Sequence, residues 1–371
     1  MKRLLLLGGG HAQLAVLASL TEQPLVGWDV RLVTPHRRQI YSGMLPGWVA
    51  GHYPLDACAI ALDALALRGG ITFHQAAAVA IDPARQSIRC DDGAELPFDR
   101  LSIDTGPVAS IANLPGSVEH ALPIRPIEGF VAAWPPIVER LRNAGQHFRL
   151  VILGAGAAGV ELAFAIGHRA AIEGWFRLRL SLVGSDTWPL DGSPDKLRRQ
   201  AAALLAERGI DWVGGRQAER IEPNRMRFDD GTALDFDACL VVTGAAAPAW
   251  PRAAGLATDD RGFIQVGPTL QSLSHTRVFA AGDIAAYAEA RPKSGVFAVR
   301  AGPTLAHNLR ASCEGRSLDA WHPQQRALYL ISTGDRHAFA SWGHWAWHGR
   351  WVWDWKDRID RRFVCRFGAV A

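Results

Sequence analysis

Short, largely apolar runs recur along the chain, and most of them lead into a glycine-rich turn. Leu4–Leu7 and Leu150–Leu153 are each followed by such a turn and then by an alanine- and leucine-rich stretch with helical spacing. Leu101–Ile103, Cys239–Val242 and Val278–Ala281 are further runs of this kind. Continuous apolar runs are typical of strands buried on both faces, as in a parallel sheet. The pattern therefore predicts an α/β fold.

The two glycine turns predict two dinucleotide sites. The first turn contains Gly8 and Gly10, continues with His11 and Ala12, and has Gln13 where a third glycine is usual. The second turn is complete, with Gly154, Gly156 and Gly159. A strand that feeds a glycine turn at a helix N-terminus directs unpaired N–H groups and the helix dipole at one place, which suits a pyrophosphate. Taken alone the first turn is weak, because a glutamine replaces the glycine that allows close helix–strand packing.

The ends of the strands that follow the two glycine turns do not decide between NADH and NADPH. Such a tip often carries an acid that holds a ribose hydroxyl, but here the two strands end in Thr34 and in Gly184-Ser185. Thr34 is expected to bond a ribose more weakly than a carboxylate does. No arginine directly follows Val183 to meet a 2′-phosphate. The sequence thus favours NADH only slightly over NADPH.

Three further landmarks complete an ordered set. They are Thr105-Gly106, Thr243-Gly244 and Gly282-Asp283, each at the end of an apolar run. With the two glycine turns, this order resembles the two-dinucleotide-binding-domain flavoproteins of the pyridine nucleotide-disulfide oxidoreductase family. YSGMLPGWVAGHY at 41–53, RPKSGVFAVRAGP at 291–303 and WVWDWKDRIDRRF at 351–363 further resemble type II NADH dehydrogenase-like proteins, including those fused to selenide, water dikinase.

The resemblance implies two Rossmann-like domains of the glutathione-reductase type, with FAD as cofactor and NADH or NADPH as co-substrate. It places an FAD domain at 1–115 and 246–315, an NAD(P)H domain at 116–245, and a small α+β segment at 316–371. The first glycine turn, Thr34, Thr105 and Gly106 would hold FAD, and the second turn with Gly244 would hold the nicotinamide nucleotide. Asp283 after Gly282 would bind the ribityl chain, its alternative role being to form a turn.

Two residues are predicted to act in catalysis on the same resemblance. Glu161 would orient the nicotinamide and flavin, although a glutamate there also complements a helix dipole. Gly295 and Val296 begin a helix expected beneath the pyrimidine end of the flavin, where its dipole stabilises negative charge. Lys293 would add a cation at that edge, or simply face solvent. An arginine at 125, where the chain crosses between domains, is read as a salt-bridge residue.

The cysteines argue against a thiol relay. Disulfide reductases of this superfamily carry a redox cysteine pair soon after the second strand, but Gln39–Trp48 contains none. The five cysteines are far apart, without a Cys-x-x-Cys pair or a His/Cys cluster at metal spacing, so no metal site is predicted. Hydride would pass directly to the flavin and on to a small acceptor. Quinone is one hypothesis, weakened because residues 294–302 lack the glutamines common in quinone-reducing relatives.

An alternative is a redox-sensing or partner-regulating flavoprotein with little turnover, linked to selenium metabolism. Bulk properties exclude other classes. Hydrophobic residues make up 49% and charged residues 20% of the 371-residue chain, which is typical of a globular enzyme. The net charge of +4 is spread out, which disfavours nucleic acid as a partner. We expect a cytoplasmic protein, with a homodimer as one arrangement.

The C-terminal segment predicts a β-meander followed by a basic amphipathic helix. Large apolar residues recur every four positions, at Trp351, Trp355, Ile359, Phe363 and Phe367, and Lys356 and several arginines are expected to supply a positive surface around them. Such a helix in 351–371 suits peripheral contact with the inner face of a membrane. It equally suits packing against the protein or a second subunit. The aspartates at 354, 357 and 360 interrupt the positive face and favour packing.

Overall fold

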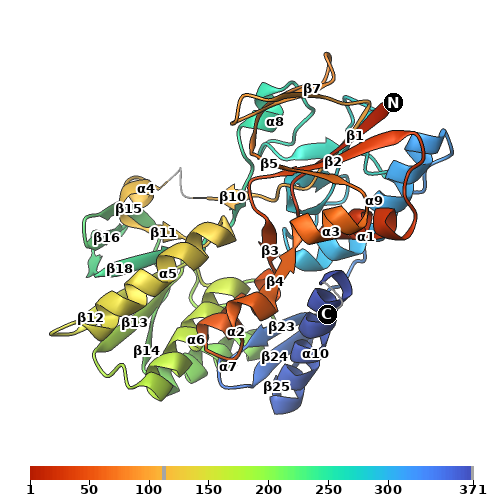
Figure 1. Cartoon of the computed structure of the whole chain (residues 1–371). Coiled ribbons are helices and arrows are strands. Elements are labelled where there is room, and N and C mark those ends of the chain that lie inside the picture. Colours follow the sequence, from red (N-terminus) through yellow and green to blue (C-terminus); the bar gives the residue numbers. More distant parts are fainter. Residues whose placement is uncertain (111–113, 369–371) are drawn as a thin grey trace.

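The computed structural model describes residues 1–110 and 114–368, and it contains two lobes, each built on a five-stranded parallel sheet (Figure 1). Residues 111–113, at the end of the first predicted FAD segment, and 369–371, at the end of the predicted membrane segment, lie outside the described residues. The strands of both sheets come from within the predicted domain ranges. The α/β class with two Rossmann-like units is thus what the chain adopts.

The first lobe joins the two ends of the predicted FAD domain. Its sheet has the order β21-β9-β1-β2-β5, and the neighbouring strands are parallel. The central strand is fully apolar from Leu4 to Leu7, which suits burial on both faces. The strands are β21 (Val278–Ala280), β9 (Arg100–Ile103), β1 (Lys2–Leu7), β2 (Trp28–Thr34) and β5 (Thr72–Gln75), with helices α1 (His11–Glu22), α3 (Leu62–Arg68) and α9 (Gly295–Glu314).

This lobe also contains shorter strands and helices outside its parallel sheet. An antiparallel excursion contains β6 (Ala78–Asp82), β7 (Ser87–Cys90) and β8 (Glu95–Pro97), and a second pair contains β3 (Arg38–Ile40) and β4 (Ala59–Ala61). The remaining elements are α2 (Leu45–Val49), β10 (Val108–Ala109), β19 (Ala245–Ala246), α8 (Trp250–Ala253), β20 (Ile264–Val266) and β22 (Ala285–Tyr287). Short 3₁₀ helices lie at Ser42–Met44, Leu55–Cys58 and Gly282–Ile284.

The second lobe is continuous in sequence. Its parallel sheet has the order β11-β18-β12-β13-β14, and a three-stranded antiparallel sheet, β15-β16-β17, is inserted between β14 and β18 in the sequence. The strands are β11 (Leu122–Pro123), β12 (Phe148–Leu153), β13 (Leu178–Val183), β14 (Ile210–Val213), β15 (Ala218–Glu222), β16 (Arg225–Phe228), β17 (Ala233–Asp235) and β18 (Ala238–Val241), and the helices are α4 (Ser117–His120), α5 (Ile127–Arg142), α6 (Ala157–Glu173) and α7 (Asp195–Glu207).

Gln13 fits where the sequence motif has its third glycine. Its side chain is fully buried, and its Oε1 accepts a hydrogen bond from the Ser102 hydroxyl on β9 at 2.8 Å. A polar contact between α1 and the sheet thus replaces the close backbone approach that glycine normally permits. The departure from the motif is therefore compatible with the same strand–turn–helix unit.

The C-terminal segment forms the predicted meander and helix. Strands β23 (Tyr329–Ser332), β24 (Ala338–Trp342) and β25 (Trp345–Gly349) pair antiparallel, and α10 (Arg350–Phe367) follows directly. Figure 1 shows α10 in dark blue, beside this sheet and near β4 of the first lobe, which it contacts. The helix thus packs on the body of the chain. None of the helices in residues 1–110 and 114–368 is long and apolar enough to cross a membrane.

The predicted apolar stripe of α10 is only partly buried. Trp351 and Ile359 remain 54% and 42% exposed, while the buried positions are Val352, Lys356, Asp360, Val364 and Phe367. Except at Phe367, each buried position is one residue C-terminal to the corresponding position of the predicted stripe. This is possible because Lys356 and Asp360 neutralise each other, with Nζ and Oδ2 2.6 Å apart. The expectation that Lys356 contributes to a positive surface is therefore wrong.

Candidate active site

A cavity of about 460 Å³ lies at the carboxyl ends of the first parallel sheet, where α/β folds bind their ligands. Its lining includes many of the residues predicted to hold FAD: Gly8, Gly10, His11, Thr34, Thr105, Gly106, Asp283 and Gly295. Val296 is in the first turn of α9, next to Gly295. The segments at 8–11, 104–108 and 283–298, which are far apart in sequence, thus meet at one site.

The glycines of the first turn are required by a close approach to β9. Gly8 has φ +89°, and a Cβ there would lie 2.4 Å from the Asp104 carbonyl oxygen. A Cβ on Gly10 would lie 2.2 Å from the Asp104 carboxylate. Larger residues at either position would push the turn away from the end of β9. The turn therefore packs against the Asp104 carboxylate on one side and lines the cavity for a ligand on the other.

Asp104 is a site residue that the sequence analysis missed. Its Oδ2 accepts hydrogen bonds from the backbone N–H groups of Ala12 and Gln13 at 2.8 and 2.9 Å, and the residue is 2% exposed. Burial, with a smaller contribution from the Asp283 carboxylate, raises the pKa of Asp104 to about 7. The Ala12 amide thus already has an acceptor at the start of α1, and the role of Ala12 in cofactor binding stays a prediction.

Two residues on the cavity wall, His11 and Gln39, each carry a buried polar atom without a hydrogen-bond partner. His11 and Gln39 both line the cavity, and the Gln39 amide nitrogen lies 3.4 Å from His11 Nδ1. His11 Nε2 and Gln39 Oε1 are buried without a hydrogen-bond partner. Burial lowers the pKa of His11 to about 4, which keeps the imidazole neutral. The polar lining of the cavity and its place at the carboxyl ends of the sheet suit a large ligand rich in donors and acceptors, as FAD is.

Asp283, the second residue of the Gly-Asp landmark, lies on the wall of the cavity. Arg125 also lines the cavity and pairs with Asp283 at 3.5 Å, as expected of a salt-bridge arginine. Burial raises the pKa of Asp283, and the charges of Arg125 and Lys293 oppose that rise.

Lys293 fits neither of its two predicted roles well. Its ammonium donates to the Ala285 carbonyl and lies 3.9 Å from the centre of the Phe263 ring, so it does not face solvent. It is not among the residues that line the cavity. Burial lowers its pKa to about 8. The side chain has partners behind Asp283, which leaves its catalytic role a prediction without support from the geometry.

The second glycine turn is arranged differently. Gly154 has φ +115°, and a Cβ there would lie 2.7 Å from the Val242 carbonyl group, while a Cβ on Gly159 would lie 1.8 Å from the Gly154 oxygen. Gly156 caps α6 without a side-chain hydrogen bond. Val242 precedes Thr243-Gly244 just as Asp104 precedes Thr105-Gly106, but it carries no carboxylate. The N–H groups of α6 are thus left for an anionic ligand.

Glu161 faces the C-terminal segment rather than acting as a surface partner of the helix dipole. Its Oε1 accepts a hydrogen bond from the Ser332 N–H at 2.8 Å. Burial raises its pKa to about 7, against the opposing charge of Lys356. Lys356 donates to the Gly43 carbonyl as well as to Asp360, both at 2.6 Å. Glu161 is therefore held in a buried network that α10 completes.

Aromatic side chains continue this network to the cavity. The ring of Phe363 on α10 stacks on Tyr41 at 4.6 Å between centroids and lies 5.7 Å from His11. Tyr53 donates to Asp357 at 2.5 Å. The sequence analysis weighed membrane contact against packing for this helix and missed its place beside the cavity. The signal available was the pair Lys356 and Asp360, four residues apart and next to the apolar stripe.

The cysteines give no support to a thiol relay. All five are free, and four are buried, with Cys365 exposed. Burial raises the pKa of Cys58, Cys239 and Cys313 to about 12, which disfavours the thiolate. Among the described residues there is thus no dithiol to carry electrons away from a flavin.

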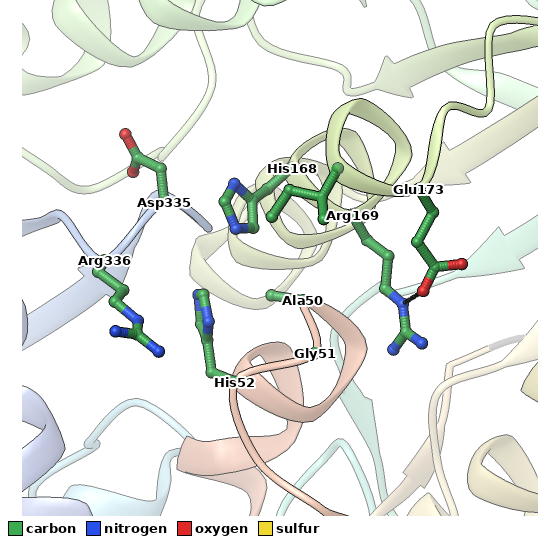
Figure 2. A pocket seen from close by; sticks show the side chains of 9 residues that line it. Ala50, Gly51, His52, His168, Arg169, Glu173, Asp335 and Arg336 are labelled. Carbon is green, nitrogen blue, oxygen red and sulfur yellow. Dashed lines mark hydrogen bonds and ion pairs between the residues drawn. The ribbon is translucent and has the colours of Figure 1, made fainter.

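A second cavity, of about 440 Å³, lies on α6 away from the glycine turn. Figure 2 shows His52 and His168 pointing toward each other, with Arg336 alongside. Their ring centres are 5.2 Å apart, and His52 Nε2 bonds the Gly334 carbonyl at 2.6 Å. The cavity joins the first lobe to the β23–β24 turn and contains none of the predicted site residues.

The fold and the two glycine-turn sites define an oxidoreductase that binds two dinucleotides. Residues 2–309 match the family of pyridine nucleotide-disulphide oxidoreductases, and the chain belongs to this family. The match confirms the predicted fold class, with FAD as cofactor and NADH or NADPH as co-substrate.

Individual relatives are more distant. Demethylphylloquinone reductase NdbB of Synechocystis sp. is 28% identical over 304 residues, which cover 79% of this chain and 73% of that protein. The structure of NDH2 from Plasmodium falciparum with NADH has a TM-score of 0.83 at 12% identity, covering 99% and 97% of the two chains. The sulfide:quinone oxidoreductase of Aquifex aeolicus has a TM-score of 0.82 at 18% identity, covering 99% and 91%. These two structures support the fold.

Asp104 predicts a specific pH dependence of stability. Folding raises its pKa from 3.8 to about 7, so the folded chain keeps a proton that the unfolded chain releases. The bound proton contributes fully to the free energy of unfolding below pH 3.8, and this contribution is lost as the pH rises to about 7. We expect Asp104→Asn, which titrates no proton there, to gain stability relative to the parent over this window, as measured by urea unfolding with FAD present.

Asp191→Asn is the matched control, because Asp191 is exposed in the other lobe. Its difference from the parent should stay constant with pH. A constant difference for Asp104→Asn as well would contradict the assigned role of burial.

Proposed function

We propose that the chain passes hydride from NADH or NADPH to FAD and then passes the electrons directly to a small acceptor, a quinone in particular. The observation that supports this most strongly is the presence of two glycine-turn sites together with five unpaired cysteines. FAD, when bound, supplies a group that accepts hydride and gives up electrons again. The oxidoreductase class is shared with the relatives described above, one of which is named a demethylphylloquinone reductase.

The residues of this chain would divide the work between the lobes. The uncapped N-terminus of α6 would bind the pyrophosphate of the nicotinamide nucleotide. Glu161, near the start of the same helix, would hold a proton close to neutral pH because burial raises its pKa to about 7. A protonated carboxyl can supply the proton that a quinone needs on reduction. Lys356 and Asp360 would position it from α10 through their charges.

Reduction of bound FAD by a nicotinamide nucleotide is the first test. Rapid mixing of the purified FAD-loaded chain with NADH or NADPH should bleach the flavin absorbance at a rate compatible with turnover. Gly159→Ala should slow this reduction about 100-fold, because a Cβ 1.8 Å from the Gly154 oxygen displaces the turn and misplaces the nucleotide. Gly145→Ala serves as control, since nothing lies within 4 Å of a Cβ there. A parent flavin that stays oxidised for minutes would instead favour the redox-sensing alternative and its link to selenium.

Reoxidation by a quinone tests the role of Glu161. With the flavin already reduced, the rate of reoxidation should fall as the pH rises through about 7, where Glu161 loses its proton. Glu161→Gln should not show this fall in rate with pH, and at low pH its reduced flavin should be reoxidised on the order of 100-fold more slowly than that of the parent. Glu207→Gln, an exposed substitution on α7, should behave like the parent. The same pH profile in Glu161→Gln and the parent would remove Glu161 from the proposal.

Exposed tryptophans support a peripheral contact with a membrane surface. Trp345 and Trp347 on β25 are 70% and 40% exposed, and Trp351 on α10 is 54% exposed, with arginines nearby in sequence. Tryptophan and arginine together suit the headgroup region of anionic lipids. The chain should therefore float with vesicles that contain anionic lipid, and replacing these three tryptophans by serine should reduce the bound fraction several-fold. Trp188→Ser, 40% exposed in the other lobe, is the control. Equal flotation of all three proteins, or none, would exclude this contact.

A further inference from the structure

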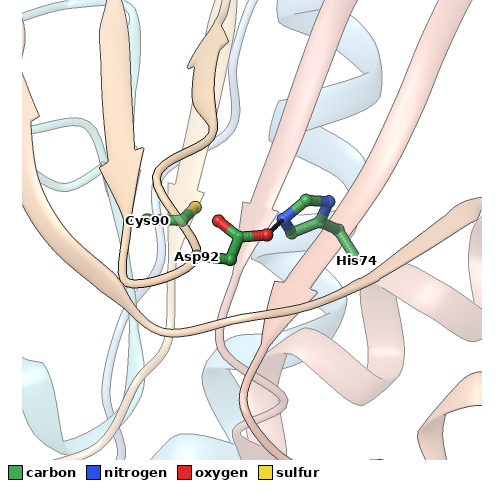
Figure 3. A group of neighbouring side chains, drawn as sticks. All are labelled: His74, Cys90 and Asp92. Atoms are coloured by element: carbon green, nitrogen blue, oxygen red, sulfur yellow. Dashed lines mark ion pairs between the residues drawn. The ribbon is translucent and has the colours of Figure 1, made fainter.

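Three potential metal ligands meet at the edge of the first lobe, away from the redox site. His74 is on β5, the edge strand of the parallel sheet, and Cys90 and Asp92 are at the end of β7 and in the turn that follows. Figure 3 shows the Asp92 carboxylate directed at the His74 ring, with the Cys90 sulfur beside it. One ligand atom from each residue lies within 4.8 Å of the other two. No local spacing motif predicts this cluster, because the strands are brought together only by the fold.

The turn that carries two of these ligands is held rigidly. Gly93, with φ +85°, donates its N–H to the Cys90 carbonyl at 3.1 Å, and Cys90 donates to the Ala94 carbonyl at 2.9 Å. Asp92 Oδ1 accepts the Ala94 N–H at 3.0 Å. Oδ2 is thus free to face His74. The backbone places the sulfur and the carboxylate without any contribution from a metal.

The His74 imidazole and the Cys90 sulfur both lie beside the Asp92 carboxylate. His74 Nε2 is shielded from solvent and lies 2.9 Å from Asp92 Oδ2, in an ion pair that is not a well-aligned hydrogen bond. The Cys90 thiol beside it is 2% exposed. A cation between the three groups would take the imidazole nitrogen, the sulfur and the carboxylate as ligands at once.

We propose that His74, Cys90 and Asp92 bind one Zn²⁺ ion, with water as the fourth ligand. Nitrogen, sulfur and a carboxylate oxygen form a ligand set typical of Zn²⁺, whereas Mg²⁺ and Ca²⁺ prefer oxygen alone. The charges of a thiolate and a carboxylate balance those of the ion. The side chain of Asp92 is 44% exposed, which gives the fourth position access to water.

The site is connected to the flavin cavity by a short stretch of backbone. Asp91 donates its N–H to the Ala77 carbonyl at 2.9 Å, and its Oδ1 accepts the Ala77 N–H at 3.0 Å. Ala76, Ala77 and Ala78 line the cavity. An ion that joins β5 to the turn after β7 would therefore fix the two segments that hold residues 76–78 in the cavity wall. Bound Zn²⁺ should slow the loss of FAD.

The test is Zn²⁺ binding to the FAD-loaded chain after treatment with a chelator. Equilibrium dialysis followed by metal analysis should show one Zn²⁺ per chain. His74→Gln, Cys90→Ser and Asp92→Asn should each weaken binding by at least about 10- to 100-fold, the loss typical of removing even an outer-shell partner. Asp91→Asn is a matched control, because it changes the same charge in the same turn and keeps an oxygen for the Ala77 N–H.

A second measurement separates ligand loss from misfolding. Co²⁺ in place of Zn²⁺ should give the intense long-wavelength absorption of a tetrahedral site with a thiolate ligand, beyond the absorption of oxidised flavin. Cys90→Ser should lose this absorption while keeping its flavin content. The proposal is overturned if the parent binds no stoichiometric Zn²⁺, if Cys90→Ser and Asp92→Asn bind it as tightly as the parent, or if bound Co²⁺ is octahedral. None of these outcomes depends on the reaction with NADH or quinone.

Discussion

The arrangement of the first lobe depends on the carboxylate of Asp104. It accepts the first free N–H groups of α1, at 2.8 and 2.9 Å, from a position at the end of β9. Two glycines are fitted against it, since a Cβ on Gly10 would lie 2.2 Å away and one on Gly282 would lie 2.3 Å away. Three sequence landmarks, the first glycine turn, Thr-Gly and Gly-Asp, therefore converge on one side chain. Replacing this residue alters all three at once.

The two nucleotide-binding units use the same architecture with opposite electrostatics. In the first, a protein carboxylate already occupies the positive end of the helix. In the second, Val242 stands at the corresponding place, and the glycine-capped start of α6 has no side-chain acceptor. The positive end of the helix is thus partly neutralised at the first glycine turn and left free at the second. This difference suits the proposal that FAD stays bound at the first turn and that the nicotinamide nucleotide exchanges at the second.

The C-terminal helix packs beside the cavity of the first lobe. The charges of its buried residues Lys356 and Asp360 act on Glu161, and Phe363 stacks on Tyr41 beside His11. Trp351 and Ile359 of the same helix remain exposed. The helix α10 therefore has two distinct faces, an inner face with a buried ion pair and an outer apolar face that stays exposed.

The sequence predicted the fold class and most of the first site because glycine turns and apolar strands report on backbone geometry directly. Gly8, Thr105 and Asp283 all line the cavity as expected. The failures concern side chains whose partners are distant in sequence. Asp104 looked like an ordinary residue before Thr-Gly, and no local pattern reveals the contacts of Lys293 with the Ala285 carbonyl and the Phe263 ring. Lys356 was read as a surface cation, because no local pattern reveals that Asp360 and Gly43 enclose it.

The order of the strands has a consequence for biosynthesis. β21 adds to β9 from nearly 180 residues later in the chain, so the first sheet stays incomplete while the second lobe is being made. The second lobe, continuous from β11 to β18, is able to fold as it leaves the ribosome. The N-terminal strands must meanwhile wait with an unpaired edge, a state in which β9 is open to wrong partners. We expect the nascent chain to need protection by a chaperone until α9 has emerged, and to take up its flavin only at the end of translation.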